Sequence, residues 1–369
     1  MRVEVCLSLL ILGILVNASS SASLYAGSNI AQHLNQAGLL AAEETVDVEY
    51  RFGFVGSGIV EGGDEASAFI PHLDLGFKWD RPHPGPFVWD KIEPVKSSYD
   101  FTETDLYVKA AQKYGIHIVA TIWPYAEWDQ EYWKQQPDWK PSKSFEDFLP
   151  ESRYKPHDMD AYKAFVKALV ERYDGDGVDD MPGLQQPIKY WEVINEPEMS
   201  SQEELNFFVG TPADYLEVVK ATYEAVKEAD PEAKVLNGGI AYVPESLEEW
   251  DSFWGEFFRL GGAQYIDIIT FHDLNPHLSE ALENLKGYLE TQGVDKPLWL
   301  TELQIAEGYD PSLGMVDEEK QAELLVKACV EAFSQGVEKI FYTSYIENPQ
   351  VSEALSKAAL VKACLLYTS

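Results

Sequence analysis

Short apolar runs alternate with amphipathic stretches from about residue 49 onward. Several runs are almost continuously apolar, as expected of parallel strands that are buried on both faces. The runs that predict strands are residues 49–57, 73–81, 116–123, 188–198, 233–241, 265–275, 297–306 and 339–348. Strands that alternate in this way with helices predict an α/β fold, a single-domain (β/α)8 TIM barrel.

Helical periodicity is clearest in residues 160–173 and 317–336, where apolar side chains recur on one face. After the last predicted strand, residues 351–365 can form one short amphipathic helix, which would be the eighth helix of the barrel, complete or truncated. We therefore assign residues 49–369 to the barrel domain.

An apolar run at residues 5–16 precedes this domain and is followed by small residues. The run is short for a membrane span and has the length typical of a signal peptide. We expect a signal peptide over residues 1–23, an N-terminal lead-in over residues 24–48, and a secreted or extracytoplasmic protein without an integral membrane domain after cleavage. Because Glu4 offsets Arg2, an uncleaved N-terminal anchor stays open as the alternative.

Composition narrows the range of partners. Acidic residues number 62 against 28 basic ones, a formal net charge of -34, which argues against nucleic acid and anionic membranes. The 3 cysteines allow no disulfide framework, and the 7 histidines include no HExxH motif. We therefore expect no metal and no cofactor. Oligomeric state stays open.

Two acidic residues lie at predicted strand ends. In a parallel barrel, the carboxyl ends of the strands carry the active-site residues. Glu196 lies in the segment Trp191–Pro197, and Glu302 closes an apolar strand. Strand alternation directs both side chains toward the same mouth of the barrel. In the later strand, it places Glu302 on the same face as Leu298 and Leu300. Two facing carboxyl groups, one protonated and one ionised, are what glycosidic bond cleavage requires.

The Asn195-Glu196-Pro197 motif and Glu302 resemble clan A of the retaining glycoside hydrolases, which are (β/α)8 barrels with catalytic acids on strands 4 and 7. The resemblance covers about residues 49–348 and is closest in appearance to family 39-like members. It implies that Glu196 is the acid/base and Glu302 the nucleophile. It also implies that Asn195 binds the sugar 2-hydroxyl and that Arg81 keeps the nucleophile ionised.

His272 matches the histidine of the clan's His-x-Tyr pattern, but here Leu274 replaces the tyrosine that contacts the nucleophile. Tyr342 and Tyr345, from the eighth strand, are the candidate substitutes. Glu192 has the same strand parity as Glu196 but lies deeper. We expect it to pair with Arg51 or Arg81 rather than to catalyse.

Aromatic residues crowd the third strand end and the long connection at residues 124–158. Trp123, Trp128 and Tyr345 are our candidates for stacking on sugar rings. The alternative for the connection, including Trp133, is a small hydrophobic core beneath a long loop.

An acidic turn at residues 174–180 is the remaining candidate ligand cluster. Its spacing departs from an EF-hand loop, so we favour a solvated turn over a calcium site.

The sequence therefore predicts a secreted retaining glycosidase that acts on β-linked polysaccharides, oligosaccharides or glycosides. The alternative is a carbohydrate-binding or cell-surface protein on the same barrel with weakened catalysis. An unrelated metal-dependent hydrolase is disfavoured by the scattered histidines. The sugar, and endo or exo action, stay open.

Overall fold

The computed structural model describes residues 50–343, apart from residues 57, 59, 61–64, 143–147, 202–205, 242, 245–252, 274–277 and 311–313. The predicted signal peptide, the lead-in, the eighth helix and Tyr345 lie outside the described residues. Among the described helices, none is long and apolar enough to cross a membrane.

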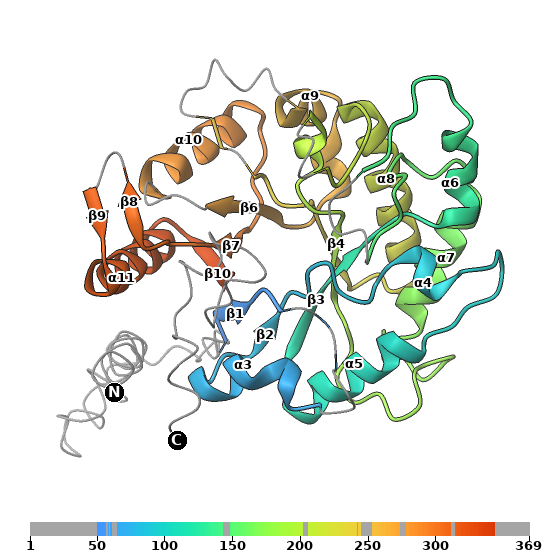
Figure 1. Ribbon diagram of the computed structural model, residues 1–369, viewed down its shortest axis with the longest axis horizontal. Helices are drawn as coiled ribbons and strands as arrows, with labels where there is room; N and C mark the ends of the chain where they lie inside the picture. The colour runs from blue at the N-terminus through green and yellow to red at the C-terminus, as the bar shows by residue number, and fades with distance from the viewer. Residues whose placement is uncertain are drawn as a thin grey trace, which may run out of the picture.

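Eight parallel strands form one sheet that curls into a barrel, which confirms the predicted (β/α)8 fold (Figure 1). The barrel strands are β1 (Phe52–Phe54), β2 (Trp79–Asp80), β3 (His117–Ile122), β4 (Tyr190–Val193), β5 (Lys234–Leu236), β6 (Ile269–Asp273), β7 (Leu298–Leu303) and β10 (Val337–Tyr342). Each overlaps one of the eight predicted runs. Neighbours follow chain order, and β10 pairs with both β7 and β1.

The barrel closes between β5 and β6 through single bridges, Leu236 to Ile268 and Ile240 to Phe271. Asn237 and Thr270 reinforce this seam, because each side chain bonds the backbone of the other residue. The closure places the ends of β4 and β6 near each other, with only β5 between them.

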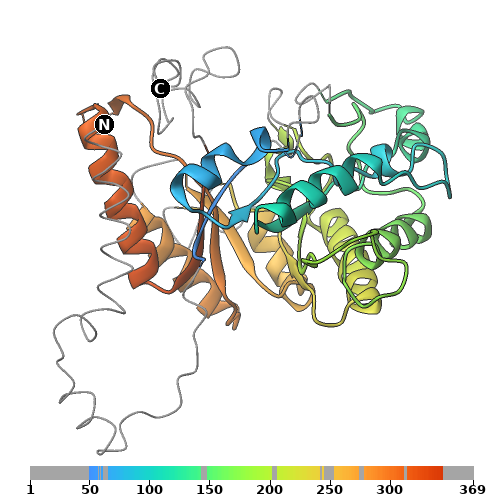
Figure 2. The same ribbon diagram turned by 90° about the horizontal axis from the view of Figure 1, so that it is seen from below.

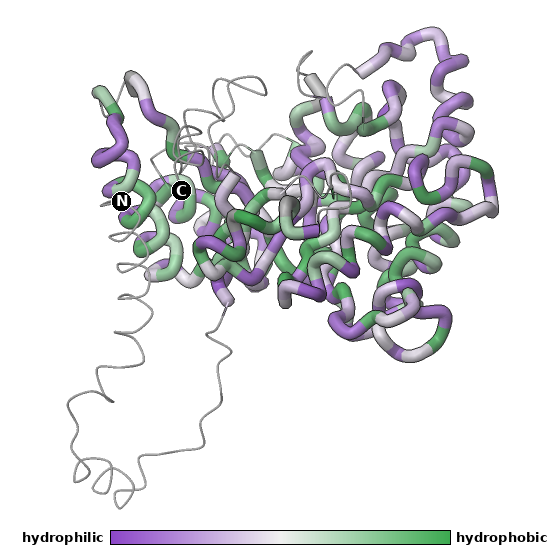
Figure 3. The backbone as a smooth tube through the Cα atoms, turned by 60° about the horizontal axis from the view of Figure 1, so that its bottom comes forward, coloured by the Kyte–Doolittle hydropathy of each residue, from purple (hydrophilic) through white to green (hydrophobic). Residues whose placement is uncertain are grey.

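Helices pack around the barrel on the side away from its axis (Figures 1 and 2). The longer ones are α5 (Thr102–Lys113), α6 (Glu127–Lys134), α7 (Met159–Glu171), α8 (Pro212–Ala229), α10 (Leu278–Thr291) and α11 (Glu318–Ser334). The shorter helices are η2 (Ser67–Phe69), α3 (Ile70–Leu75), α4 (Trp89–Ile92), η3 (Pro197–Ser201), α9 (Phe253–Arg259) and η5 (Gly262–Tyr265). Hydrophilic and hydrophobic positions alternate along this outer layer (Figure 3).

The sequence specifies where these helices begin. Thr211 and Asp214 form a reciprocal capping box around Pro212 at the start of α8, and the carboxylate of Asp158 caps α7. Both helices predicted from periodicity, α7 and α11, are confirmed. A short hairpin, β8 (Gly308–Asp310) with β9 (Gly314–Val316), follows β7 and was not predicted.

The barrel interior changes from apolar to polar along its axis. Residues in the strands or directly beside them build one cluster, which includes Trp79, Trp299 and Phe341. Farther along the same strands, toward their carboxyl ends, the interior holds Arg81 and Glu192. The aromatic layer thus seals the barrel beneath the polar groups.

Candidate active site

Arg81 is the hub of the polar layer. It follows β2, is fully buried, and its guanidinium donates three hydrogen bonds. Nε reaches Oε2 of Glu192 at 2.8 Å, Nη1 reaches Oε1 of Glu302 at 2.8 Å, and Nη2 reaches Oδ1 of Asn195 at 2.5 Å. One cation therefore links residues that follow or belong to β2, β4 and β7.

Glu192 is the buried partner of Arg81, one of the two pairings that strand parity allowed. Arg51 instead bonds the backbone carbonyls of Val337 and Glu338. Thr121 Oγ1 adds a bond of 2.8 Å to Oε2 of Glu192. Burial raises the pKa of Glu192 to about 7, against the opposing charge of Arg81.

Glu196 is presented by an abrupt turn at the end of β4. Ile194 has φ 65° and Glu196 has φ 42°, so two non-glycine residues adopt left-handed backbone conformations within three positions. The backbone N–H of Glu196 donates to the carbonyl of Gly238 at 2.5 Å, which secures the turn. Burial raises the pKa of the 7% exposed Glu196 to about 7, opposed by Arg81 and Asn195.

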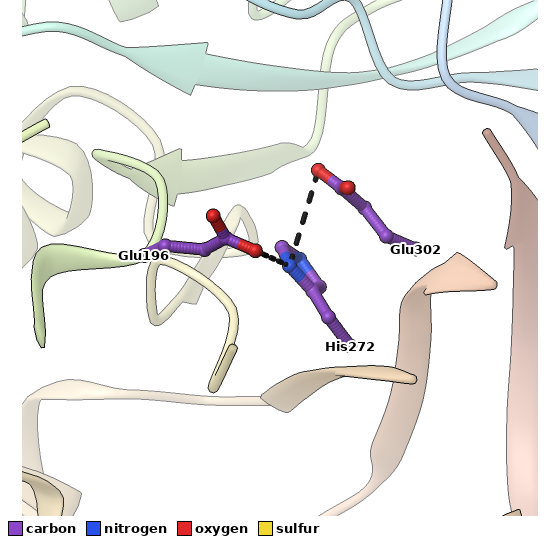
Figure 4. Close-up of side chains that lie close together, drawn as sticks. All are labelled: Glu196, His272 and Glu302. Carbon is purple, nitrogen blue, oxygen red and sulfur yellow. Dashed lines mark hydrogen bonds and ion pairs between the residues drawn. The ribbon is translucent and has the colours of Figure 1, made fainter. Parts of the chain in front are cut away.

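His272, at the end of β6, lies between the two glutamates (Figure 4). Its Nδ1 is 2.7 Å from Oε1 of Glu196 and 3.9 Å from Oε1 of Glu302. One carboxylate oxygen of each glutamate and one ring nitrogen of His272 all lie within 4.8 Å of one another. Burial lowers the pKa of His272 to about 4, so the ring is neutral near pH 7.

Gly239 makes room for the His272 ring. The residue has φ +67°, and a Cβ atom there would lie 2.2 Å from Nε2 of His272. Only glycine combines this backbone conformation with so close an approach.

The orientation of Glu302 corrects one expectation from strand alternation. Leu298 and Leu300 belong to the cluster that includes helix residues, whereas Trp299 faces the barrel interior. The pairing register with β6 shifts between Leu300 and Glu302, and this irregularity turns Glu302 into the mouth. The expected shared face was therefore wrong for Leu298 and Leu300, because alternation is broken by the bulge.

The atoms of this site are poorly suited to hold a metal cation. Oε1 of Glu302 already accepts from Arg81, and Oε1 of Glu196 is engaged by His272. A cation between them would displace these bonds and lie close to a buried guanidinium charge. The donor set instead favours proton transfer between groups that are hydrogen-bonded to one another.

Trp123 and Trp128, two of the predicted aromatic residues, make their hydrogen bonds outside this immediate cluster. Trp123 is fully buried, and its indole N–H donates to the carbonyl of Pro84 at 2.6 Å. Trp128 packs edge-on against Trp89 with ring centroids 5.1 Å apart, and its N–H donates to the carbonyl of Glu93. These contacts favour the small hydrophobic core for Trp128 and an indirect role for Trp123.

Of the two candidate substitutes for the missing tyrosine, Tyr342 is directed away from Glu302 to another partner. The Tyr342 hydroxyl donates to the carbonyl of Ile305 at 3.4 Å, and Tyr345 lies outside the described residues. The acidic turn holds its carboxylates against its own backbone: Asp174 accepts from the N–H of Asp176, and Asp180 from those of Gly175 and Gly177. These bonds explain Asp174 and Asp180 as residues that stabilise the turn's own backbone.

His83 belongs to the site, although sequence reasoning missed it. Its ring lies 5.8 Å from that of Trp123 and 5.5 Å from that of Phe207. Burial, followed by the charges of Arg81 and His272, lowers its pKa well below the ordinary value. The signal was its position two residues after Arg81, at the exit of the same strand.

No protein-family model and no curated protein matches the sequence. Solved structures match the fold. A glucosidase from Croceicoccus marinus has a TM-score of 0.57 and 17% identity, over 85% of this chain and 63% of that one. The chain thus spans less than two thirds of the glucosidase.

Two xylanases match over most of their own length. An intracellular xylanase from Thermoanaerobacterium saccharolyticum has a TM-score of 0.54 and 14% identity, over 86% of this chain and 92% of that one. Xylanase 10B from Thermotoga petrophila, solved in complex with xylobiose, has a TM-score of 0.54 and 17% identity, over 85% and 89%. At these identities the similarity establishes the barrel fold.

Proposed function

We propose that this protein is a retaining glycoside hydrolase that cleaves β-linked glycosidic bonds. The observation that carries the proposal is the approach of the Glu196 and Glu302 carboxylate oxygens, which lie within 4.8 Å of each other. Inverting enzymes separate the two groups by about 6.5–9.5 Å to admit a water, whereas retaining enzymes place them about 5–5.5 Å apart.

The surroundings of the two carboxyl groups support a different role for each. Glu302 contacts the Arg81 guanidinium, which stabilises the carboxylate and suits a nucleophile. Glu196 has a pKa of about 7, so a large fraction is protonated at neutral pH, as a general acid requires.

The reaction then proceeds in two displacements. Glu196 gives its proton to the leaving glycosidic oxygen while Glu302 attacks the anomeric carbon, and the bond to the leaving group breaks. In the second step Glu196 takes a proton from water, whose oxygen displaces Glu302 from the anomeric carbon. His272 contacts Glu196 as a neutral ring, so it can orient the acid without adding a charge.

The names of the structural neighbours support a carbohydrate substrate, because they include a glucosidase and two xylanases. The test is a panel of aryl β-glycosides and β-linked xylooligosaccharides, incubated with and without a chelator. We expect hydrolysis that is insensitive to chelation, and a first-formed product with the β configuration by NMR. Binding without turnover would favour the carbohydrate-binding alternative, and an α product would contradict retention.

Secretion is part of the proposal and rests on the apolar run at residues 5–16. The secreted protein should begin near residues 20–24 when its N-terminus is sequenced. Recovery of a secreted chain that still contains Cys6 would contradict cleavage.

A further inference from the structure

Glu198 is an acidic residue of the mouth that the proposed mechanism does not use. It lies two positions beyond Glu196, on the 3-10 turn η3. Its Oε1 accepts a hydrogen bond of 2.6 Å from the backbone N–H of Ala241. Its Oε2 is buried and has no hydrogen-bond partner among the residues that the structure describes. A buried carboxyl group in this position calls for a specific reason.

The backbone that Glu198 contacts also supports the two groups that meet at the acid/base. The carbonyl of Gly238 accepts from the N–H of Glu196, and the carbonyl of Ile240 accepts from the N–H of His272 at 2.9 Å. Ala241 is the next residue along this segment. The Glu198 side chain therefore completes a ring of contacts that runs from the Glu196 turn, through residues 238–241, to His272 and back to the Glu196 carboxyl group.

We propose that Glu198 is a positioning residue, which fastens the turn carrying Glu196 to the backbone that supports His272. Its importance for turnover rests on the proposed glycosidase function, since only that reaction requires Glu196 to transfer a proton. A displacement of about 1 Å in a reacting group can cost about 100-fold in rate, so a side chain that fixes this turn matters without touching substrate.

The charge state of Glu198 indicates which substitution preserves its side chain most closely. Burial raises its pKa to about 8, opposed by the nearby indole of Trp254 and by the N–H of Ala241, and the charge of Glu196 raises it further. Among the residues that the structure describes, Tyr215 also faces it, and its hydroxyl lies between the carbonyl of Val193 and the N–H of Gly238. Glu198 is therefore mostly uncharged at pH 7, and glutamine can replace it with little change in shape or charge.

The test compares Glu198→Ala with Glu198→Gln. The alanine variant removes the acceptor of the Ala241 N–H, whereas the glutamine variant keeps a carbonyl oxygen there. On a phenyl β-glycoside, we expect kcat/KM to fall about 10- to 100-fold in Glu198→Ala and to recover in Glu198→Gln. Added azide should accelerate Glu198→Ala on substrates with good leaving groups, as it does when an acid/base is displaced. Glu256→Ala, at an exposed position of α9, is the matched control and should change neither.

A second measurement tests the contact without any activity. The Ala241 amide should exchange slowly with solvent in the wild type and in Glu198→Gln, and at least 10-fold faster in Glu198→Ala. Unchanged exchange and unchanged kcat/KM in Glu198→Ala would each overturn the role of Glu198. If the wild type hydrolyses no glycoside, the proposed function fails, while the exchange result still decides whether Glu198 fastens the turn.

Discussion

Nη1 of Arg81 lies 2.8 Å from Oε1 of Glu302, and the guanidinium that makes this ion pair has no exposed surface. The same cation faces Glu192, whose side chain is also fully buried. Removing a charge from such a pair is costly, because the partner is left buried and uncompensated. Arg81 therefore pairs with the proposed nucleophile and with a second carboxyl group beneath it.

Arg81→Met should damage both activity and stability. The methionine keeps the unbranched apolar stem of the side chain but leaves Glu192 and Glu302 without their cation. We expect kcat/KM to fall at least 100-fold and the free energy of unfolding to fall by about 3–5 kcal/mol. Denaturant unfolding and aryl glycoside kinetics check the two effects. Arg259→Met, at an exposed position, is the control, and equal losses in both variants would contradict the role of Arg81.

The pKa of Glu196 predicts an alkaline limit to activity. The raised value, about 7, means that the general acid is protonated below pH 7 and loses its proton as pH rises through that value. For a phenyl glycoside, kcat/KM should fall about tenfold per pH unit above pH 7. For a dinitrophenyl glycoside, whose leaving group needs no proton, the decline should be absent.

Glu192 has a similar pKa, so its deprotonation is an alternative cause of the alkaline decline in kcat/KM. Glu196→Gln separates the two. With the phenyl substrate, the residual activity of this variant should show no alkaline decline near pH 7, whereas a persistent decline would assign it to Glu192.

Gly239→Ala should disable the site through His272. The new Cβ would meet Nε2 of His272 at 2.2 Å, so the ring must leave its place beside Glu196. Gly177→Ala is a matched control, since its φ of +95° is also unfavourable for alanine but nothing lies within 4 Å of the added Cβ. Both variants should lose about 1 kcal/mol of stability from backbone strain, and only Gly239→Ala should lose kcat/KM by tenfold or more. Equal kinetics in the two would show that His272 does not orient Glu196.

The barrel could be predicted from the sequence because its signals are local. A strand such as β3 is an apolar run, and a helix such as α7 has an apolar stripe and an N-terminal cap. The strand ends at which Glu196 and Glu302 stand follow from the same pattern.

The orientation of the site's side chains could not be predicted, because it depends on departures from regular secondary structure. A bulge turns Glu302 inward, and left-handed backbone at Ile194 and Glu196 redirects the end of β4. His83 enters the site through burial beside Trp123 and Phe207, a tertiary relationship that spacing alone does not reveal.

Trp128→Ala should affect stability rather than binding. The ring packs against Trp89 at 5.1 Å, and Lys96 lies 5.4 Å from the ring centroid. Loss of this packing should lower the free energy of unfolding by about 2–4 kcal/mol, measured by denaturant titration. The value of KM should remain within about twofold. A higher KM with an unchanged unfolding midpoint would return Trp128 to the sugar-stacking role.

The two proposed catalytic roles predict different products when azide replaces the lost carboxylate. In Glu302→Ala, no covalent intermediate can form, so turnover should be abolished. Azide can then attack a β-glycoside directly from the face that Glu302 occupied, which gives an α-glycosyl azide and restores turnover.

In Glu196→Ala, the first displacement on Glu302 still occurs when the leaving group is good, and the second step slows because no base activates water. Azide needs no base, and it attacks the intermediate from the opposite face, so the product should be the β-glycosyl azide. NMR of the anomeric proton distinguishes the two azides directly. The reversed assignment of products would exchange the roles of Glu196 and Glu302. Because the two variants differ only in which carboxyl group is missing, each serves as the control for the other.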